Sequence, residues 1–403
     1  MTNLLLTGIG ELVTNDPERE GLLGVVTDAA VAVKGGRIAW VGPETELLRE
    51  FRELPELDGA GRAVLPGFVD SHTHLVFGGN RADEFARRVR GESYQEIMAA
   101  GGGIMSTVAS TRATDSDTLL DEAVRRAQRM LGMGTTTVEV KSGYGLEVET
   151  ELRMLEVANS IAEYVPIDVV TTFLGAHVVP AEYEDDRDAY LRLIVEEMLP
   201  AAGGMATFCD VFCDDGAFAV DEARVILAAA AEQGLAARLH ANQLGHSGGA
   251  SLAAELGAIT ADHLDHLTDA DIAGLLAAGT VAVLFPTVSF SLRLDPPPAR
   301  RLWDAGVPVA IATDCNPGTS YVENMQFVIA AATLTTGLTP EESVWAATRG
   351  GARALQFDDR GWIKPGTVAD LVMLEADSYL EIPYRPGTDL VRMVIKGGEA
   401  VVS

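Results

Sequence analysis

The sequence has few cysteines, few lysines and no long apolar run, and each shortage excludes a class of protein. Among its 403 residues only Cys209, Cys213 and Cys315 are cysteines, which is too few for a disulfide framework and is typical of a reducing compartment. No apolar stretch approaches the roughly 20 residues of a membrane span. The first residues lack the basic start of a secretory signal. We therefore expect a cytoplasmic protein.

Positive charge is also scarce. Lys and Arg number 30 against 59 Asp and Glu, so the net charge is −29. Such a surface repels phosphate backbones and anionic lipids, and we expect neither nucleic acid nor a membrane as a partner. Apolar residues make up 47% of the chain and charged residues 22%, which excludes disorder and predicts a folded globular protein. Lysine is especially scarce, and Lys141 is the only lysine in the sequence between Lys34 and Lys364.

The two ends of the chain resemble each other. Residues 31–42 and 394–402 are both β-rich runs interrupted by Lys-Gly-Gly, the pattern of a hairpin with a glycine turn. Strands this similar are expected to pair in one small sheet. The sequence thus predicts a composite β-sandwich domain formed by residues 1–62 plus 359–403, with residues 63–358 inserted as a second domain.

The inserted part alternates short β-branched runs with amphipathic segments. Eight such runs begin at Ala63, Thr135, Asp168, Thr207, Ala236, Ala258, Thr280 and Pro308. This alternation predicts an α/β fold, a TIM-like (β/α)8 barrel whose chemistry lies at the carboxyl ends of the strands. A doubly wound open sheet is the alternative. The connection from His74 to Thr135 is unusually long and contains the glycine run 99–108, typical of a lid or binding loop.

Histidines gather at the predicted strand ends. Five of the seven lie there, namely His72, His74, His177, His240 and His263. His72 and His74 are two residues apart, so both rings project to one side of an extended strand end and can share a metal ion. With His240 and Asp314 they supply three imidazoles and a carboxylate, which suit Zn²⁺ or Fe²⁺ with one position open for water. Taken singly, His240 could be a core histidine and Asp314 a helix N-cap.

Several motifs resemble the amidohydrolase superfamily, which pairs a metal-binding barrel with a small composite β domain. They are P-G-F-V-D-S-H-T-H and the closing G-W-I-K-P-G-T-V-A-D-L-V. More narrowly, H-T-H-L-V-F-G-G-N-R, V-E-V-K-S-G-Y-G-L, T-F-L-G-A-H, L-H-A-N-Q and T-D-C-N-P-G-T-S resemble the imidazolonepropionase family. The resemblance implies hydrolysis of 4-imidazolone-5-propanoate to N-formimidoyl-L-glutamate in histidine degradation. It also implies one Zn²⁺ or Fe²⁺/Fe³⁺ per chain and a homodimer.

The resemblance assigns catalytic roles that agree with the chemistry of amide hydrolysis. A bound metal lowers the pKa of water to about 7. Asp314 could take the water's proton and pass it to the departing ring nitrogen. His263 would orient the water or stabilise the developing oxyanion, although a hydrogen bond to Asp262 or Asp265 is the alternative for its ring. Gln243 matches a family position that contacts the ring and assists catalysis.

The family's substrate contacts match further residues, which are Arg81, Tyr144, His177, Gln243, Asn316, Gly318 and Thr319. Arg81 would bind the propanoate carboxylate in bidentate geometry. His177 would donate a hydrogen bond to a ring carbonyl. Arg87, Arg88 and Arg90 follow Arg81 and are expected to form a solvated helix face.

Two features bear on the number of metal ions and on rival functions. Binuclear members of the superfamily bridge their metals with a carboxylated lysine at the fourth strand, whereas this chain has none there, so we expect one metal. Lys141 could act as such a bridge from the second strand, or form an ion pair with Glu139.

The three cysteines have no metal or nucleophile pattern, and His246 and His266 are expected at the surface. A nucleobase deaminase and an inactive scaffold protein are the rival functions.

Overall fold

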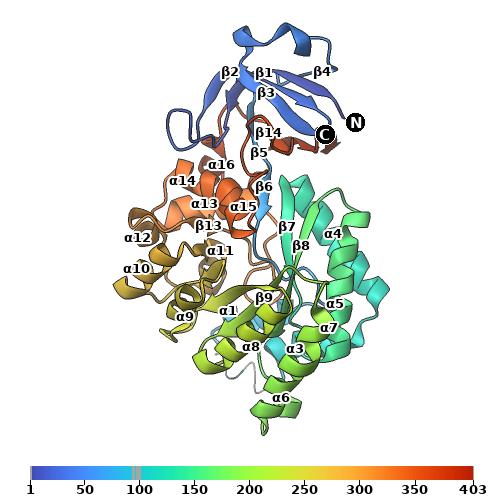
Figure 1. Ribbon diagram of the computed structural model, residues 1–403, viewed down its shortest axis with the longest axis vertical. Helices are drawn as coiled ribbons and strands as arrows, with labels where there is room; N and C mark the ends of the chain where they lie inside the picture. The colour runs from blue at the N-terminus through green and yellow to red at the C-terminus, as the bar shows by residue number, and fades with distance from the viewer. Residues whose placement is uncertain (1, 93–95, 97–100, 403) are drawn as a thin grey trace.

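The computed structural model describes residues 2–92, 96 and 101–402, and Figure 1 shows a small β domain above a larger barrel. The larger domain is an eight-stranded parallel sheet of β6 (Phe68–Asp70), β7 (Thr135–Lys141), β8 (Asp168–Ala176), β9 (Phe208–Cys213), β10 (Ala236–Ala241), β11 (Thr260–His263), β12 (Val281–Leu284) and β13 (Val309–Ile311). All eight predicted runs contribute a strand to it. No helix in the described part of the chain is both long and apolar enough to cross a membrane.

The barrel closes between its first and last strands. Neighbouring strands pair in chain order from β6 to β13. Thr73 and Cys315, which follow β6 and β13, form a parallel bridge. The backbone N–H of Asp314 donates to the carbonyl of His72 over 3.1 Å, and Asp70 accepts hydrogen bonds from the backbone and hydroxyl of Thr313 over 3.1 and 2.7 Å. The closure thus joins the loops that carry predicted metal ligands, which confirms the TIM-like fold.

Helices surround the barrel (Figure 1). They are α1 (Ala82–Val89), α3 (Ile104–Ala113), α4 (Ser116–Gly132), α5 (Val148–Ser160), α6 (Arg187–Leu193), α7 (Leu199–Ala202), α8 (Val220–Glu232), α9 (Gly249–Leu256), α10 (Asp269–Ala278), α11 (Pro286–Leu292), α12 (Ala299–Asp304), α13 (Met325–Thr335), α14 (Pro340–Trp345) and α15 (Gly351–Ala354). Their ends follow local sequence signals. In α10, Thr268 and Asp271 form a reciprocal capping box, and Gly279 ends the helix at φ 72°.

The small domain is a sheet built from both chain ends. Its strands are β1 (Leu4–Leu12), β2 (Val26–Lys34), β3 (Arg37–Pro43), β4 (Glu56–Asp58), β5 (Ala63–Pro66), β14 (Leu371–Leu374), β15 (Val391–Lys396) and β16 (Glu399–Val402), with the short helix α16 (Glu381–Tyr384) nearby in sequence. Both Lys-Gly-Gly motifs form the predicted hairpin turns. The turns touch, since a Cβ on Gly36 would lie 2.9 Å from the carbonyl oxygen of Gly397. The sheet therefore curls until its two outer hairpins meet.

The chain passes from the small sheet to the barrel at Gly67. The predicted run that begins at Ala63 is divided there, because β5 pairs with β1 and β14 while β6 pairs with β7. A side chain at Gly67 would lie 2.2 Å from the hydroxyl of Thr136. The domain division into 1–62 plus 359–403 and 63–358 stays a proposal, with this change of sheet just after its first boundary.

The long first connection of the barrel is mostly helical. It contains α1, α3 and α4, and its expected role as a lid or binding loop stays a prediction. Ala99 and Ala100, the first residues of the predicted glycine run, lie outside the described residues. Gly103 precedes α3 directly.

Candidate active site

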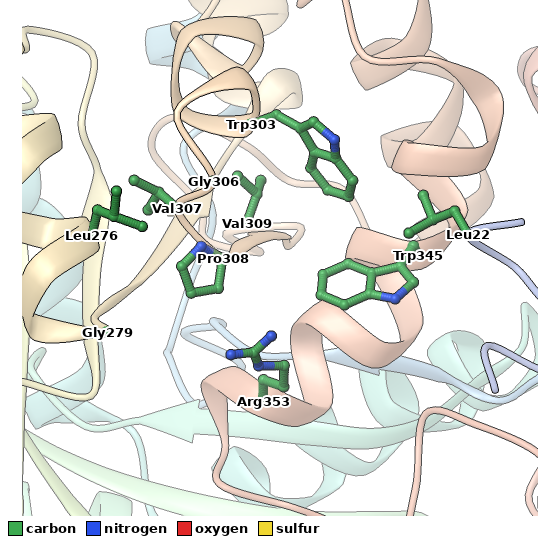
Figure 2. A pocket seen from close by; sticks show the side chains of 10 residues that line it. All are labelled: Leu22, Leu276, Gly279, Trp303, Gly306, Val307, Pro308, Val309, Trp345 and Arg353. Atoms are coloured by element: carbon green, nitrogen blue, oxygen red, sulfur yellow. The ribbon is translucent and has the colours of Figure 1, made fainter. Parts of the chain in front are cut away.

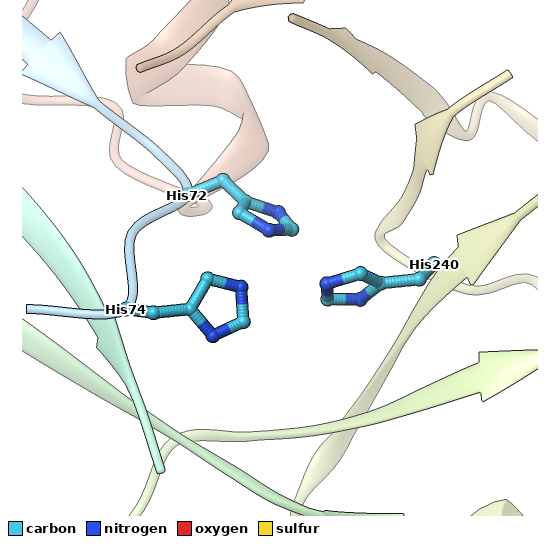
Figure 3. Close-up of side chains that lie close together, drawn as sticks. All are labelled: His72, His74 and His240. Carbon is cyan, nitrogen blue, oxygen red and sulfur yellow. The ribbon is translucent and has the colours of Figure 1, made fainter. Parts of the chain in front are cut away.

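Five histidines converge at the carboxyl end of the barrel, as the sequence predicts. His72 and His74 follow β6, His177 follows β8, His240 lies near the end of β10, and His263 ends β11. The rings of His72, His74 and His240 point toward one another (Figure 3). Each offers a nitrogen within 4.8 Å of the other two, and all three are buried. The fold thus brings together side chains separated by more than half of the barrel sequence.

Asp314 completes this group from the far side of the barrel closure. Its Oδ1 atom lies 3.5 Å from Nε2 of His72 and 3.5 Å from Nε2 of His74. Ligands about 2.1 Å from a tetrahedral metal ion are separated by roughly 3.4 Å. Nε2 of His72 and Nε2 of His240 have no hydrogen-bond partner within the described residues. Buried nitrogens without partners around one carboxylate oxygen fit a metal ion.

The backbone conformation of Asp314 and the pKa values of the histidines suit metal binding. Asp314 adopts φ 47°, a left-handed conformation that residues other than glycine seldom take. Burial, together with the charge of Lys141, holds the pKa of His72 well below its usual range. Burial likewise lowers the pKa of His74. Both rings are therefore neutral at pH 7, which is the form that binds metals.

Two aspartates lie behind the metal-facing histidines. Oδ2 of Asp262 lies 2.6 Å from Nδ1 of His72, and Oδ1 of Asp210 lies 3.1 Å from Nδ1 of His240. Asp262 also accepts a hydrogen bond from Arg238 over 3.3 Å. Because a carboxylate accepts, Nδ1 of His72 carries the hydrogen, and Nε2 keeps its lone pair for the metal.

A second group of possible metal ligands, formed by His72, Asp210 and Asp262, already contains a cation. Nζ of Lys141 lies 2.8 Å from Oδ2 of Asp210 and 4.0 Å from Oδ2 of Asp262. It also donates a hydrogen bond to Glu139 over 2.7 Å. Lys141 therefore forms an ion pair with Glu139, which is one of the two roles that the sequence suggests for it.

His263 lies beside the metal group and adopts φ 74°. Its ring lies 5.1 Å from that of His240 and 4.5 Å from that of Phe285, measured between centroids. Its Nδ1 atom has no hydrogen-bond partner in the part of the chain that the structure describes. Asp262 is hydrogen-bonded to His72. The structure therefore differs from the alternative expectation that the His263 ring bonds to Asp262.

The loop after β7 positions Tyr144 and His177. Their rings lie 5.4 Å apart, and each lies within 5.6 Å of the ring of His74. Glu151 holds this loop, because its carboxylate accepts backbone hydrogen bonds from Gly143 over 2.9 Å, from Gly145 over 2.7 Å and from Leu146 over 2.8 Å. Sequence reasoning missed Glu151.

The hydrogen bond of His177 determines which of its ring nitrogens carries the hydrogen. Its Nδ1 lies 2.9 Å from the carbonyl oxygen of Gly143, and a carbonyl can only accept, so Nδ1 carries the hydrogen. Burial, with the neighbouring His240, lowers the pKa of His177 to about 3. The neutral ring therefore presents Nε2 as an acceptor, whereas the sequence led us to expect a donor.

Arg81 lies at the start of α1 and faces the loop after β13. A Cβ on Gly318 would lie 2.3 Å from Nη1 of Arg81, so the guanidinium is packed against the backbone of Gly318. Arg88, one of the three arginines expected on a solvated face, instead donates to the carbonyl of Gly318 over 3.2 Å. Arg87 pairs with Glu92. The predicted carboxylate-binding arginine thus lies beside the predicted pocket loop.

The remaining predicted contacts lie in two loops. In the first, the amide of Asn316 donates to Thr319 and to the carbonyl of Asp314, and accepts from the backbone of Gly318 and Thr319. These hydrogen bonds fix the shape of the loop that follows Asp314. In the second, the backbone N–H of Gln243 donates to Asp214 over 2.6 Å, and its side chain is half-buried.

Several other features are not part of the candidate metal group. His246 and His266 are exposed, as predicted, and the three cysteines are buried and free. A cavity of about 410 Å³ lies at the opposite end of the barrel, before β12 and β13 (Figure 2). Trp303, Trp345 and Arg353 line it, and it contains no predicted site residue.

The carboxylates behind the histidines were missed, although the sequence holds a signal for them. Asp210 interrupts the apolar run F-C-D-V-F-C, and Asp262 lies in the strand end T-A-D-H. Neighbouring strands carry further polar residues at alternate positions, as in V-E-V-K and R-L-H, and this spacing places them on one face of a strand. In a barrel that face is the interior, where a charge needs a partner of opposite sign.

The chain matches two protein-family models. The model of the Amidohydrolase family matches residues 63–401. The model of the Imidazolonepropionase-like composite domain of bacteria matches residues 29–53. The first match covers most of the chain, and the second lies within the small sheet.

The chain is also similar to individual proteins over its full length. It is 51% identical to the imidazolonepropionase of Mycolicibacterium smegmatis over 402 residues, covering 100% of this chain and 98% of that protein. It is 47% identical to the imidazolonepropionase of Streptomyces griseus, covering 100% of both chains. A solved triazine hydrolase variant superposes with a TM-score of 0.79 at 18% identity, covering 100% of this chain and 95% of that chain. That last likeness concerns the fold alone.

Proposed function

The chain belongs to the imidazolonepropionase family of amidohydrolases, and from that membership we propose how its residues open the ring of 4-imidazolone-5-propanoate. The enzyme is a metal-dependent cyclic amidohydrolase of histidine degradation. Water adds to the ring carbonyl, the carbon–nitrogen bond breaks, and N-formimidoyl-L-glutamate results. The observation that carries the assignment of residues is the convergence of His72, His74, His240 and Asp314 on one buried point.

These four residues would hold a single Zn²⁺ or iron ion. Three neutral nitrogens and one carboxylate oxygen leave one position open, as catalytic sites require. When bound, the ion makes water a strong nucleophile at neutral pH and polarises the carbonyl. The ammonium of Lys141 already lies in the second group of donors, which supports one ion per chain.

Asp314 and His263 would manage the proton and the charge. Oδ1 of Asp314 faces the histidine nitrogens, whereas Oδ2 lies 3.5 Å from the hydroxyl of Thr319. Oδ2 is therefore the atom that takes the proton of the attacking water and delivers it to the departing ring nitrogen. His263 would donate a hydrogen bond to the oxygen on which negative charge develops.

The substrate's other groups would bind to Arg81, Tyr144 and His177. Arg81 would bind the propanoate carboxylate through its guanidinium. The Tyr144 hydroxyl stays protonated at neutral pH, because burial and the nearby Asp314 raise its pKa. It is therefore available as a donor. Nε2 of His177 would accept a ring N–H, which distinguishes an imidazolone from a ring without that hydrogen.

Turnover tests this proposal directly. The chain is incubated with 4-imidazolone-5-propanoate, and loss of ring absorbance is followed together with formation of formimidoylglutamate. A chelator should abolish the activity, and Zn²⁺ or Fe²⁺ should restore it. No turnover of the imidazolone, combined with release of ammonia from a nucleobase, would instead identify a deaminase.

The setting of the reaction follows from the same family membership. We propose that the enzyme acts in the cytoplasm, as a homodimer, on a small anionic substrate. Gel filtration with light scattering checks the dimer.

A further inference from the structure

Lys141 is a fully buried cation at the end of β7. Its ammonium group lies 2.7 Å from Oε1 of Glu139 and 2.8 Å from Oδ2 of Asp210, with Oδ2 of Asp262 at 4.0 Å. Side chains of all four residues are 0% exposed. A lysine in such a place needs a reason, because burying an ammonium group is costly unless opposite charges surround it.

Two of its three carboxylate neighbours reach metal-facing histidines. Asp262 lies 2.6 Å from Nδ1 of His72, and Asp210 lies 3.1 Å from Nδ1 of His240. Asp210 also accepts a hydrogen bond from the backbone N–H of His240 over 3.1 Å. A carboxylate in this position fixes the tautomer and the orientation of a metal-binding ring. Lys141 therefore contacts both carboxylates that orient the rings.

The charges of the buried carboxylates around Lys141 depend on its ammonium group. Arg238 is the other cation that contacts one of these carboxylates among the described residues, and its Nη2 atom lies 3.3 Å from Oδ2 of Asp262. Asp210 has no contact with Arg238 among the ion pairs of the described residues, so its charge is balanced by Lys141. Without the ammonium group, Glu139 and Asp210 would be buried negative charges side by side, and their repulsion would turn one of them away.

We propose that Lys141 is a positioning residue of the metal centre, which holds Asp210 and Asp262 so that His240 and His72 face one metal ion. The same ammonium group fills the second group of donors and directs the ion to the first. This inference rests on the proposed function, because it concerns how the metal of that reaction is held. Lys141 itself touches neither the metal nor the substrate.

The test measures metal affinity and needs no substrate. Apoprotein is titrated with Zn²⁺ in competition with a chromophoric chelator, for the full chain and for Lys141→Met, Asp210→Asn and the double variant. We expect Lys141→Met to raise the Zn²⁺ Kd about 10–100-fold, the usual effect of losing such a partner. In the double variant the two losses should overlap, so that the combined effect is smaller than their product. Lys34→Met, at an exposed lysine paired with Glu50, is the matched control and should leave the Kd unchanged.

Other results would overturn the proposal. A Lys141→Met Kd within twofold of the wild-type value, or losses that multiply in the double variant, would show that Lys141 only stabilises the barrel. If Lys141→Met does not fold, the pair Asp210→Asn and Asp262→Asn replaces it, because both aspartates contact the same ammonium group and their losses should overlap too. If the wild-type chain binds no Zn²⁺, the proposed function fails together with this inference. If the wild-type chain binds Zn²⁺ and the variants bind it equally well, only the inference about Lys141 fails.

Discussion

Arg81 and Glu84 form an ion pair at the start of α1 in which Nε and Nη2 of the arginine both lie 2.8 Å from one carboxylate oxygen. The same carboxylate accepts a hydrogen bond from the backbone of Gly103 over 3.2 Å. Glu84 therefore ties the arginine to Gly103, the residue that precedes α3. The guanidinium is held in place before any substrate arrives, and Nη1 points toward Gly318.

Arg81→Lys should weaken substrate binding without removing the metal. Lysine keeps the charge but loses the planar fork that binds a carboxylate with two hydrogen bonds. With about 1.5–3 kcal/mol for a charged hydrogen bond, KM should rise roughly 10–100-fold while kcat changes little. Steady-state kinetics and metal analysis check this. Arg90→Ala, at an exposed arginine that ends the same helix, is the control, and loss of metal in Arg81→Lys would show a structural role instead.

Glu151→Gln should disturb the loop that carries Tyr144. The amide group would direct N–H atoms at backbone donors that now bond to the carboxylate. We expect a loss of about 1–3 kcal/mol in the free energy of unfolding. Displacement of Tyr144 and of the Gly143 carbonyl should lower kcat/KM by up to about 100-fold. Thermal melts and kinetics measure both, with the exposed Glu149→Gln as control, and an unchanged kcat/KM would contradict the role.

The carboxyl group of Asp265 should make stability depend on pH. Burial, and next the charge of Asp214, raise its pKa to about 7. Because this value exceeds that of the unfolded chain, the folded state binds more protons between about pH 4 and pH 7, and stability falls as the pH rises through that range. Asp265→Asn should therefore match the wild type near pH 4 and be about 1–2 kcal/mol more stable at pH 8.

Chemical denaturation of both proteins at the two pH values checks the Asp265 prediction. The same substitution at the exposed Asp185 is the control. A variant that is less stable than the wild type at pH 8 would show that the ionised carboxylate has a partner that stabilises it.

Moderate salt should increase kcat/KM. The chain carries a net charge of −29 and its substrate is an anion. Raising the ionic strength from 0.01 to 0.15 M shortens the screening length from about 30 to 8 Å, which reduces the repulsion and should raise kcat/KM about twofold or more. A neutral analogue with an amide in place of the carboxylate should lack this dependence. A kcat/KM that falls over the same range would refute the idea.

The sequence predicted the parts of the fold that depend on local pattern. The alternation of apolar runs predicted the barrel, and the Lys-Gly-Gly motifs predicted both hairpins, because turn residues and side-chain period are local properties. It placed the run from Ala63 in one strand, although Gly67 divides it between two sheets. That division depends on Thr136, which packs against Gly67 from another strand.

The predicted metal ligands lie together because each lies at or just after the carboxyl end of a parallel strand of the barrel. The role of His177 could not be predicted, since it depends on the carbonyl of Gly143 in a different loop. Arg88 likewise bonds to Gly318, distant in the sequence. Pairings across the barrel carry no local signal, so they require the folded chain.

The origin of the small sheet from two separate parts of the chain has a consequence for biosynthesis. Strands β1 to β5 leave the ribosome before the barrel, whereas β14 to β16 leave it after the barrel. The β5 edge of the sheet therefore stays unpaired while the barrel is made, until β14 follows and covers it.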